Sequence, residues 1–270
     1  MSRATPMRTV GGWLAAVCGL LVAGNAAAAG FSALVSPPRF EDKAKAGTTY
    51  RNVIEITNVS SQRAHYTLRT ADWQLNADGS AVFSEALAPG SCRPWVGVEA
   101  PEILVDANAK RRYRFEVAVP AGAPSGECRF AIMLEGDPEP VKGELALPVS
   151  GRIGVIVYLA IGDAAARLDV VDSQVQAIEG RHLPLLHVRN SGNAHGRMEG
   201  MIDGKDASGR RYTFSPSNLP ILAGETRGVV LNPEGDNEDT PAPAIVYPLT
   251  LKGRLEWGAQ HLDIETTLSQ

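Results

Sequence analysis

The sequence contains none of the short motifs that mark common enzymes. Its 270 residues hold no GxSxG, HExxH, P-loop or GxGxxG pattern, and its five histidines are scattered. His182 and His187 stand five residues apart, which puts them on opposite faces of a strand. Because neither a nucleophilic triad nor a metal-ligand spacing is present, we expect no catalytic residue, no bound metal and no cofactor.

The chain also lacks an excess of basic charge and a long apolar run after its N-terminal segment. There are 26 Lys+Arg against 30 Asp+Glu, for a formal net charge of −4 at pH 7. A mildly acidic chain is a poor candidate for binding nucleic acid. No later run approaches the roughly 18 apolar residues that suggest a membrane span. We therefore expect neither a nucleic-acid partner nor a membrane span in the mature chain.

The N-terminus has the pattern of a secretory signal peptide. Arg3 and Arg8 precede an apolar stretch over residues 10–22, and residues 25–30 read NAAAAG, which suits cleavage after a small residue. The apolar stretch is shorter than the roughly 20 residues that a membrane span needs. We predict that residues 1–29 are removed and that the mature protein is exported to an oxidising compartment.

Cysteine is scarce, and only Cys92 and Cys128 remain once the signal peptide is removed. No CxxC pattern occurs. In an oxidising compartment the simplest prediction is a disulfide, which would close a loop of about 36 residues and contribute about 3 to 4 kcal/mol. A reactive thiol or a metal ligand is the alternative, and no other feature of the sequence supports it.

Convincing helical periodicity is missing as well. Short segments that alternate apolar and polar residues recur between Gly, Pro, Asn and Asp, which is typical of an all-β sandwich rather than of alternating strands and helices. The clearest predicted strands are Val53–Thr57, Tyr66–Trp73, Tyr113–Val119 and Phe130–Leu134.

Two segments of the chain share a similar plan. Ile54–Asn58 and Leu186–Asn190 each read as a strand that leads through an asparagine into a turn and a new strand. Asparagine suits such a turn because its side chain can bond to nearby backbone groups. The mature length of about 240 residues also fits two domains of about 100 to 120 residues. We predict two sandwich domains, at residues 30–162 and 163–270.

One stretch is too long for an ordinary strand. In ELALPVSGRIGVIVYLAIG, which spans Glu144–Gly162, every odd-numbered position from 145 to 161 is aliphatic except Gly151. One face would therefore be apolar along its whole length, whereas a typical strand has only about 5 to 6 residues. Pro148 cannot donate a ladder hydrogen bond, so it indicates a sheet edge.

We predict that this stretch divides at Gly151. From Ile153 onward the apolar side chains would cover the core of the first domain, as the last strand of a sandwich must. Upstream, Leu145, Leu147 and Val149 would face a partner, because an apolar edge strand is tolerated when another chain pairs with it. The alternative is that all of these side chains face the core of their own domain.

Four segments carry a resemblance to a known family: Ser36–Phe40, Val53–Asn58, Pro124–Leu134 and Leu145–Ile153. Through them nearly the whole mature chain resembles the periplasmic pilus, or fimbrial, chaperones of the chaperone/usher pathway, which are PapD-like proteins. The resemblance implies an all-β fold of two immunoglobulin-like β-sandwich domains in an L-shaped arrangement. It also implies a periplasmic chaperone whose partners are a pilus subunit and an outer-membrane usher.

The resemblance further implies a donor strand. In the family, alternating aliphatic residues of the last strand of domain one are inserted into the subunit. Leu145, Leu147 and Val149 fall on those positions, and Ile153 continues the row.

A carboxylate anchor is implied in the same way. In the family, an arginine of the first strand and a lysine of the last strand bind the terminal carboxylate of the subunit, and such charge-assisted contacts fix the register of the added strand. Arg39 resembles the arginine, whereas Gly154 stands at the lysine position, with Arg152 as the neighbouring substitute. The alternative function is a cell-surface structural or adhesive immunoglobulin-like module, which would leave the apolar row beside an arginine unexplained.

Overall fold

The computed structural model describes residues 31–140, 148–235 and 242–270, so the predicted signal peptide, Leu145 and Leu147 lie outside it. Within these ranges the regular secondary structure is β-strand, apart from one short 3-10 helix, η1 (Arg93–Trp95). The all-β prediction is confirmed. No helix in the described ranges is long and apolar enough to cross a membrane.

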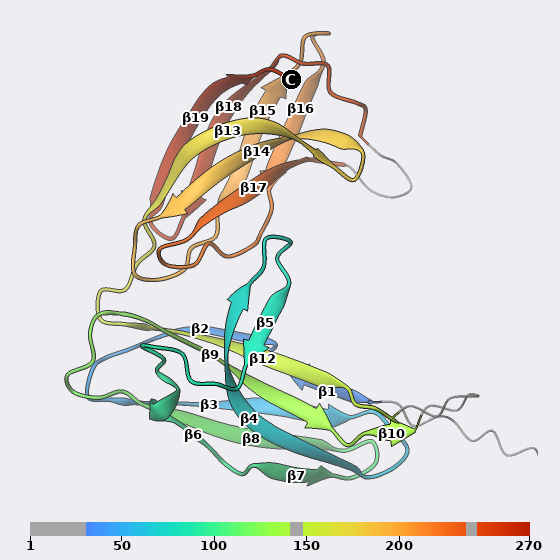
Figure 1. The fold of residues 1–270 in the computed structure, drawn as a ribbon, viewed down its shortest axis with the longest axis vertical. Helices are drawn as coiled ribbons and strands as arrows, with labels where there is room; N and C mark the ends of the chain where they lie inside the picture. Colours follow the sequence, from blue (N-terminus) through green and yellow to red (C-terminus); the bar gives the residue numbers. More distant parts are fainter. Residues whose placement is uncertain (1–30, 141–147, 236–241) are drawn as a thin grey trace, which may run out of the picture.

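Two sheets make the N-terminal sandwich (Figure 1). One has the strand order β1-β3-β8-β6 and the other the order β2-β12-β9-β4-β5, with β7 also paired to β4. The strands are β1 (Ala33–Ser36), β2 (Arg39–Ala44), β3 (Thr49–Asn58), β4 (Ala64–Leu75), β5 (Ala81–Ser84), β6 (Val96–Val98), β7 (Glu102–Val105), β8 (Lys110–Ala118), β9 (Gly126–Gly136), β10 (Glu139–Pro140), β11 (Pro148–Val149) and β12 (Arg152–Ile161).

The N-terminal segment changes sheets at its prolines. β1 pairs antiparallel with β3, and after Pro37 and Pro38 the chain continues as β2, which pairs in parallel with β12. Proline has no N–H for a ladder, which suits a point where a strand leaves one sheet for another. Phe40 of β2 then turns inward and packs edge-on against Phe115, with ring centroids 5.3 Å apart.

β12 is the closing strand that the sequence predicts. Val155, Val157, Leu159 and Ile161 are all buried in the core between the two sheets, whereas Ile153 is half-buried. The opposite face of β12 also meets apolar groups. There Ile156 and Tyr158 join a second cluster with Trp73, Met133 and Phe83, which lie on β9 and on the long β4–β5 hairpin.

The C-terminal sandwich is one seven-stranded sheet folded over its own core, in the order β13-β14-β17-β16-β15-β18-β19. β17 joins the two layers, because Thr226–Val230 pair with β14 and Leu231–Pro233 pair with β16. Its strands are β13 (Leu168–Ile178), β14 (Arg181–Asn190), β15 (Glu199–Lys205), β16 (Arg211–Pro216), β17 (Thr226–Pro233), β18 (Leu249–Trp257) and β19 (Gln260–Leu268). In Figure 1 the two sandwiches meet at a steep angle.

The predicted turn asparagines hold equivalent places in the two sandwiches. Asn58 is fully buried; its Nδ2 donates to the carbonyls of Gln62, Val105 and Asp106. Asn190 is equally buried, and its Nδ2 donates to the carbonyls of Ala194 and Ile221. Because each amide ties a strand end to two other segments, the predicted repeat is confirmed at these two turns. The predicted boundary between residues 162 and 163 falls between β12 and β13 and stays a prediction.

The predicted disulfide is present. Cys92 and Cys128 are bonded and both are buried. The bond ties the segment before η1 to β9, the strand that pairs with β12 along its length. It therefore braces the middle of the sheet that carries the long apolar strand.

Candidate partner-binding edge

The first half of β12 is a sheet edge. β9 pairs with β12 from Arg152 onward, whereas β2 pairs only from Ile156 to Ile161. No other described strand pairs with residues 152–155, which we call the open edge of β12. Ile156 N–H donates to the Pro38 carbonyl over 3.2 Å, away from β9. Because backbone direction alternates along a strand, the N–H and C=O groups of Gly154 and Arg152 point to the same open side.

A two-stranded arm continues the open edge beyond the sandwich. β10 and β11 pair antiparallel, with Glu139 opposite Val149 and Pro140 opposite Pro148, and they prolong β9 and β12 as Figure 1 shows. Both strands of such a ribbon are edges, which is where proline is tolerated. Of the predicted donor residues, Val149 lies in β11, whereas Leu145 and Leu147 lie outside the described residues.

The predicted break at Gly151 coincides with a gap between β11 and β12. A Cβ on Gly151 would lie 2.1 Å from the Phe31 ring, and one on Gly136 would lie 2.6 Å from it. The Gly136 N–H nevertheless donates to the Gly151 carbonyl over 3.1 Å, so the ladder crosses the gap. The glycines therefore let Phe31 cover the end of the core without separating the two strands.

The two arginines of the predicted anchor lie apart. Arg39 opens β2 opposite Ile156; its side chain is 46% exposed and forms a 2.6 Å ion pair with Glu41. Arg152 lies opposite Glu135. It is four residues upstream of Ile156, so the backbone positions of Arg152 and Ile156 are about 13 Å apart along β12. The structure does not bring the two side chains to one point, and their role as an anchor stays a prediction.

Gly154, the position of the family's lysine, lies beneath the β4–β5 hairpin. A Cβ there would be 2.8 Å from Cζ of Phe83 and 3.2 Å from Sδ of Met133. A long cationic side chain cannot occupy this position while Phe83 packs on the sheet. The hairpin therefore occupies the space that a lysine side chain at this position would need.

A cluster of charged groups joins the two sandwiches. His195, from the segment between β14 and β15, stacks on Tyr158 of β12 with ring centroids 3.7 Å apart. Its Nδ1 contacts Glu127 Oε2, and its backbone N–H donates to the same oxygen over 3.1 Å. Glu41 Oε1 lies 3.8 Å from His195 Nε2 and 3.6 Å from Arg197 Nε. Burial is the main reason that the pKa of Tyr158 rises to about 12.

Sequence reasoning missed this cluster. Glu127 and His195 stand 68 positions apart, and neither belongs to a motif that could have indicated the pairing. The cluster joins the two sandwiches through the contacts of His195 with Glu127 and Tyr158, and so its geometry fits a structural joint. Among the described residues no group of His, Cys, Asp and Glu has the arrangement of a metal site.

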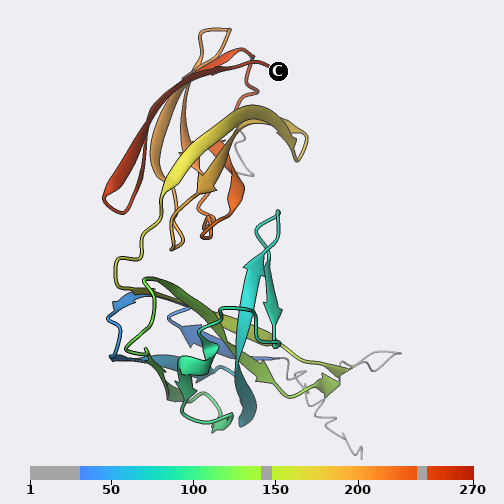
Figure 2. The ribbon, with the colours of Figure 1, turned by 60° about the vertical axis from the view of Figure 1, so that its left-hand side comes forward.

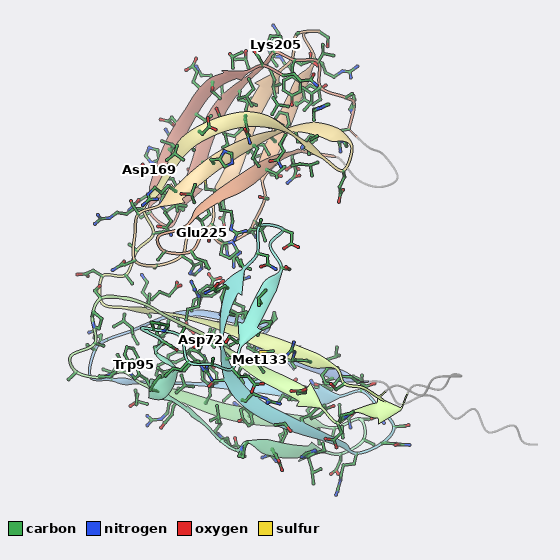
Figure 3. The ribbon with its side chains drawn as sticks, viewed as in Figure 1. Asp72, Trp95, Met133, Asp169, Lys205 and Glu225 are labelled. Atoms are coloured by element: carbon green, nitrogen blue, oxygen red, sulfur yellow. A yellow bond between two sulfur atoms is a disulfide. The ribbon has the colours of Figure 1, made fainter. Side chains whose placement is uncertain are left out.

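The β4–β5 hairpin makes a second bridge between the sandwiches. Its tip reaches the C-terminal sandwich in both ribbon views (Figures 1 and 2). Arg227 of β17 donates to the Asn76 carbonyl over 3.0 Å and to the Leu75 carbonyl over 3.4 Å. Figure 3 places Glu225, which pairs with Arg227, at the end of the C-terminal sandwich that faces the hairpin.

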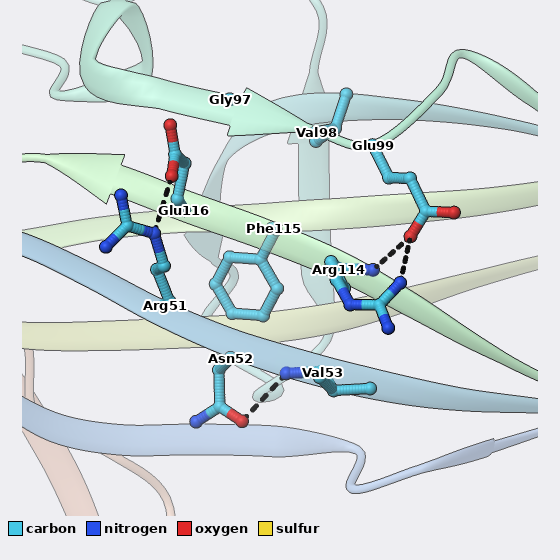
Figure 4. A pocket seen from close by; sticks show the side chains of 9 residues that line it. All are labelled: Arg51, Asn52, Val53, Gly97, Val98, Glu99, Arg114, Phe115 and Glu116. Atoms are coloured by element: carbon cyan, nitrogen blue, oxygen red, sulfur yellow. Dashed lines mark hydrogen bonds and ion pairs between the residues drawn. The ribbon is translucent and has the colours of Figure 1, made fainter.

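A hollow on the other sheet offers no comparable site. The hollow has a volume of about 540 Å³ and lies over β3, β8 and β6. Gly97, which has no side chain, is one of its lining residues (Figure 4). An Arg51–Glu116 ion pair of 2.9 Å borders one side, and Glu99 bonds to Arg114 on the other. Because these charges pair with each other, the hollow presents no unmatched group that would select a ligand.

Solved chaperones of pili and fimbriae are similar to this chain. The YadV chaperone shares 11% identity at a TM-score of 0.47, covering 88% of this chain and 100% of its own. The class 5 fimbriae chaperone CfaA shares 13% identity at a TM-score of 0.47, covering 87% of this chain and 98% of its own. A chain of the CsuC–CsuE chaperone–tip adhesion subunit complex of Acinetobacter baumannii shares 14% identity at a TM-score of 0.45, covering 88% of this chain and 100% of its own. Such values assign no function to this chain. No family model and no curated protein matches its sequence.

Proposed function

We propose that the protein is a non-enzymatic periplasmic chaperone that holds a pilus or fimbrial subunit by strand donation. The observation that carries the proposal is the open edge of β12, which continues into the β10–β11 arm. An edge of unpaired N–H and C=O groups beside apolar side chains is an aggregation hazard unless a partner covers it. A subunit that lacks a strand is a partner of this kind, because the added strand supplies both the ladder and the apolar side chains.

The donor residues in this proposal are Leu145, Leu147 and Val149, with Ile153 at the point where the row enters the sandwich. Val155 and the odd-numbered residues after it are buried in the protein's own core, so they are not available to a subunit. Donation is therefore confined to the arm and the open edge.

Arg39 is the proposed anchor for the terminal carboxylate of the subunit. Its side chain is about half exposed. Arg39 lies opposite Ile156, where the pairing of β2 with β12 begins and the open edge therefore stops. Binding would exchange the Glu41 carboxylate for that of the subunit, at little cost because exposed ion pairs are weak. Arg152, at the far end of the open edge, would contact the added strand about 13 Å away rather than share the same carboxylate.

Residues 30–162 would form the chaperone domain and residues 163–270 the second immunoglobulin-like domain. The signal-peptide pattern and the buried disulfide favour an oxidising, periplasmic location. Delivery of the subunit to an outer-membrane usher completes the proposed role.

Co-purification of a subunit with the wild type and with Leu147→Asp tests the proposal. We expect the charged side chain to abolish recovery of the subunit while circular dichroism and the thermal midpoint stay unchanged, because in this proposal Leu147 faces the subunit rather than the core of its own domain. Leu34→Asp is the matched control, since Leu34 is 62% exposed on β1, in the other sheet, and its replacement should leave recovery unchanged. Equal recovery with both variants would contradict strand donation.

Arg39→Ala tests the anchor separately. We expect recovery of the subunit to fall about tenfold or more, as loss of a charge-assisted contact predicts. The cell-surface module remains the alternative function, and it is not favoured because it gives no role to the open edge. Wild-type protein displayed on the cell surface with no bound subunit would support it instead.

A further inference from the structure

Glu41 of β2 lies at the joint between the sandwiches, and one of its carboxylate oxygens faces three basic side chains. Glu41 Oε1 is 2.6 Å from Arg39 Nε, 3.6 Å from Arg197 Nε and 3.8 Å from His195 Nε2. Arg39 belongs to the N-terminal sandwich, whereas His195 and Arg197 lie between β14 and β15 of the other sandwich. The same oxygen therefore lies between the proposed anchor and the joint.

The distances show which of these contacts Glu41 makes in the protein alone. At 2.6 Å the contact with Arg39 is a close ion pair, whereas 3.6 Å to Arg197 is too long for an N–H···O hydrogen bond. Arg39 and Glu41 stand two residues apart on β2, so their side chains share one face of that strand. Glu41 is 41% exposed at the side chain and is free to change its rotamer.

Arg197 is held in place with one donor unused. Its side chain is 13% exposed, and its Nη1 donates to the Asn218 carbonyl over 2.7 Å. Its Nε is buried and has no hydrogen-bond partner among the described residues. A buried charged donor without a partner is unfavourable. Because Glu41 already lies beside this nitrogen, a shift of less than about 1 Å would bring Oε1 to the usual N–H···O distance.

A carboxylate bound at Arg39 would change the balance between these contacts. It would take the partner of Glu41 and place a second negative charge beside it, and like charges at such a distance repel. Arg197 is always protonated and is the nearest other cation. Since Arg197 is far less exposed than Arg39, its ion pair with Glu41 would be screened less by solvent.

We propose that Glu41 couples the anchor to the joint, an inference that rests on the proposed function of Arg39. When the terminal carboxylate of a subunit takes Arg39, Glu41 moves to Arg197 Nε and ties β2 to the C-terminal sandwich. A loaded molecule therefore has a tighter joint than a free one. Because such coupling is reciprocal, a tighter joint also favours the bound carboxylate. Glu41 is a positioning residue in this step and does not contact the subunit.

The Arg197 Nε–H signal in proton–nitrogen spectra of the full mature chain tests the proposal. Arg197→Lys identifies the signal by removing it. Arg39→Ala frees Glu41 without any subunit, so we expect the signal to move downfield and its exchange with water to slow about tenfold or more, as a new charged hydrogen bond predicts. The double variant Arg39→Ala/Glu41→Gln should show neither change.

Arg51→Ala is the matched control. Arg51 forms an exposed ion pair of 2.9 Å with Glu116 on the opposite sheet, so its loss should leave the Arg197 signal where it is in the wild type. An unmoved Arg197 signal in Arg39→Ala would overturn the proposal. The same downfield move in the double variant would overturn it as well, because Glu41 would then not be the cause.

The wild-type protein in complex with a co-purified subunit separates this inference from the proposed function. We expect the Arg197 signal of the complex to match that of Arg39→Ala. A stable complex whose Arg197 signal stays at the position of the free protein would overturn the coupling and leave strand donation standing. Failure to recover any complex would contradict strand donation, whereas the Arg39→Ala comparison needs no subunit and decides by itself where Glu41 goes.

Discussion

Gly154 is a residue whose identity is set by a distant part of the chain. On the outer face of β12 it faces Phe83 of β5, which occupies the space that a side chain would need. The sequence alone shows a glycine where the resemblance described above would place a lysine. The structure supplies the reason, which is that this protein covers the outer face of β12 with an aromatic ring.

Replacing Gly154 with alanine should destabilise the protein by about 1 to 3 kcal/mol, because the new Cβ must displace a packed ring and Met133. Urea unfolding monitored by circular dichroism measures the change. Gly122→Ala is the matched control, since a Cβ there meets nothing within 4 Å, and its effect should stay within about 1 kcal/mol.

A double variant separates the clash from a backbone effect. Phe83→Leu should recover much of the stability that Gly154→Ala removes, since residues in contact do not act additively. Equal losses in Gly154→Ala and Gly122→Ala would show that Phe83 does not restrict this position.

Some residues could be predicted from sequence and others could not, for a physical reason. The turns at Asn58 and Asn190 depend on local chemistry, so a short segment was enough to indicate them. The Glu127–His195 contact depends on how two sandwiches meet, and nothing near either residue carries that information.

At the scale of elements, the downstream half of the long apolar stretch is the buried closing strand that its pattern predicts, whereas the partner-facing role of the upstream half stays a prediction. The odd-numbered residues from Val155 to Ile161 are buried, and the strand is interrupted around Gly151. The pattern did not indicate that β2 would stop pairing at Ile156 or that β10 and β11 would form an arm. Both features depend on partners elsewhere in the chain, and period-two alternation reports only on the strand itself.

The disulfide should be the strongest single brace of this sheet. Replacing Cys92 and Cys128 together with alanine should lower the free energy of unfolding by about 3 to 4 kcal/mol, because the bond closes a loop of 36 residues in the unfolded chain. The segment should keep its native position, since Arg93 still bonds to Thr70 and to the carbonyl of Glu85.

Urea unfolding with and without dithiothreitol measures this contribution. The reductant should lower the stability of the wild type to that of the double variant and should leave the variant unchanged. A reduced wild type as stable as the oxidised protein would contradict a bracing role.

At the scale of the whole molecule, two separate bridges hold the sandwiches at one angle. The Glu127–His195 cluster lies near the chain connection, and the tip of the β4–β5 hairpin lies on the other side of the joint. A Cβ on Gly79 would lie 2.7 Å from the Leu219 side chain, which shows how closely the hairpin tip packs. Two bridges on opposite sides restrict hinge motion more than one does.

Arg227→Met should loosen the joint without unfolding either sandwich, because it removes the donors to the Leu75 and Asn76 carbonyls. Small-angle scattering should report a larger radius of gyration, and spin labels on the two sandwiches should report a broader distance distribution. Arg189→Met is the matched control, since Arg189 is exposed on β14. Identical profiles for the two variants would mean that the hairpin does not hold the angle.

The parallel pairing of β2 with β12 also has a consequence for the order of events during synthesis. The earliest part of this sheet to be made, Arg39–Ala44, finds its partner in the last strand of the N-terminal sandwich. Such distant pairing is slow, because the intervening chain must be ordered before the contact can form. The nascent N-terminal sandwich therefore keeps Phe40 uncovered until Ile161 has been added, and this interval is when a newly made molecule itself most needs protection from aggregation.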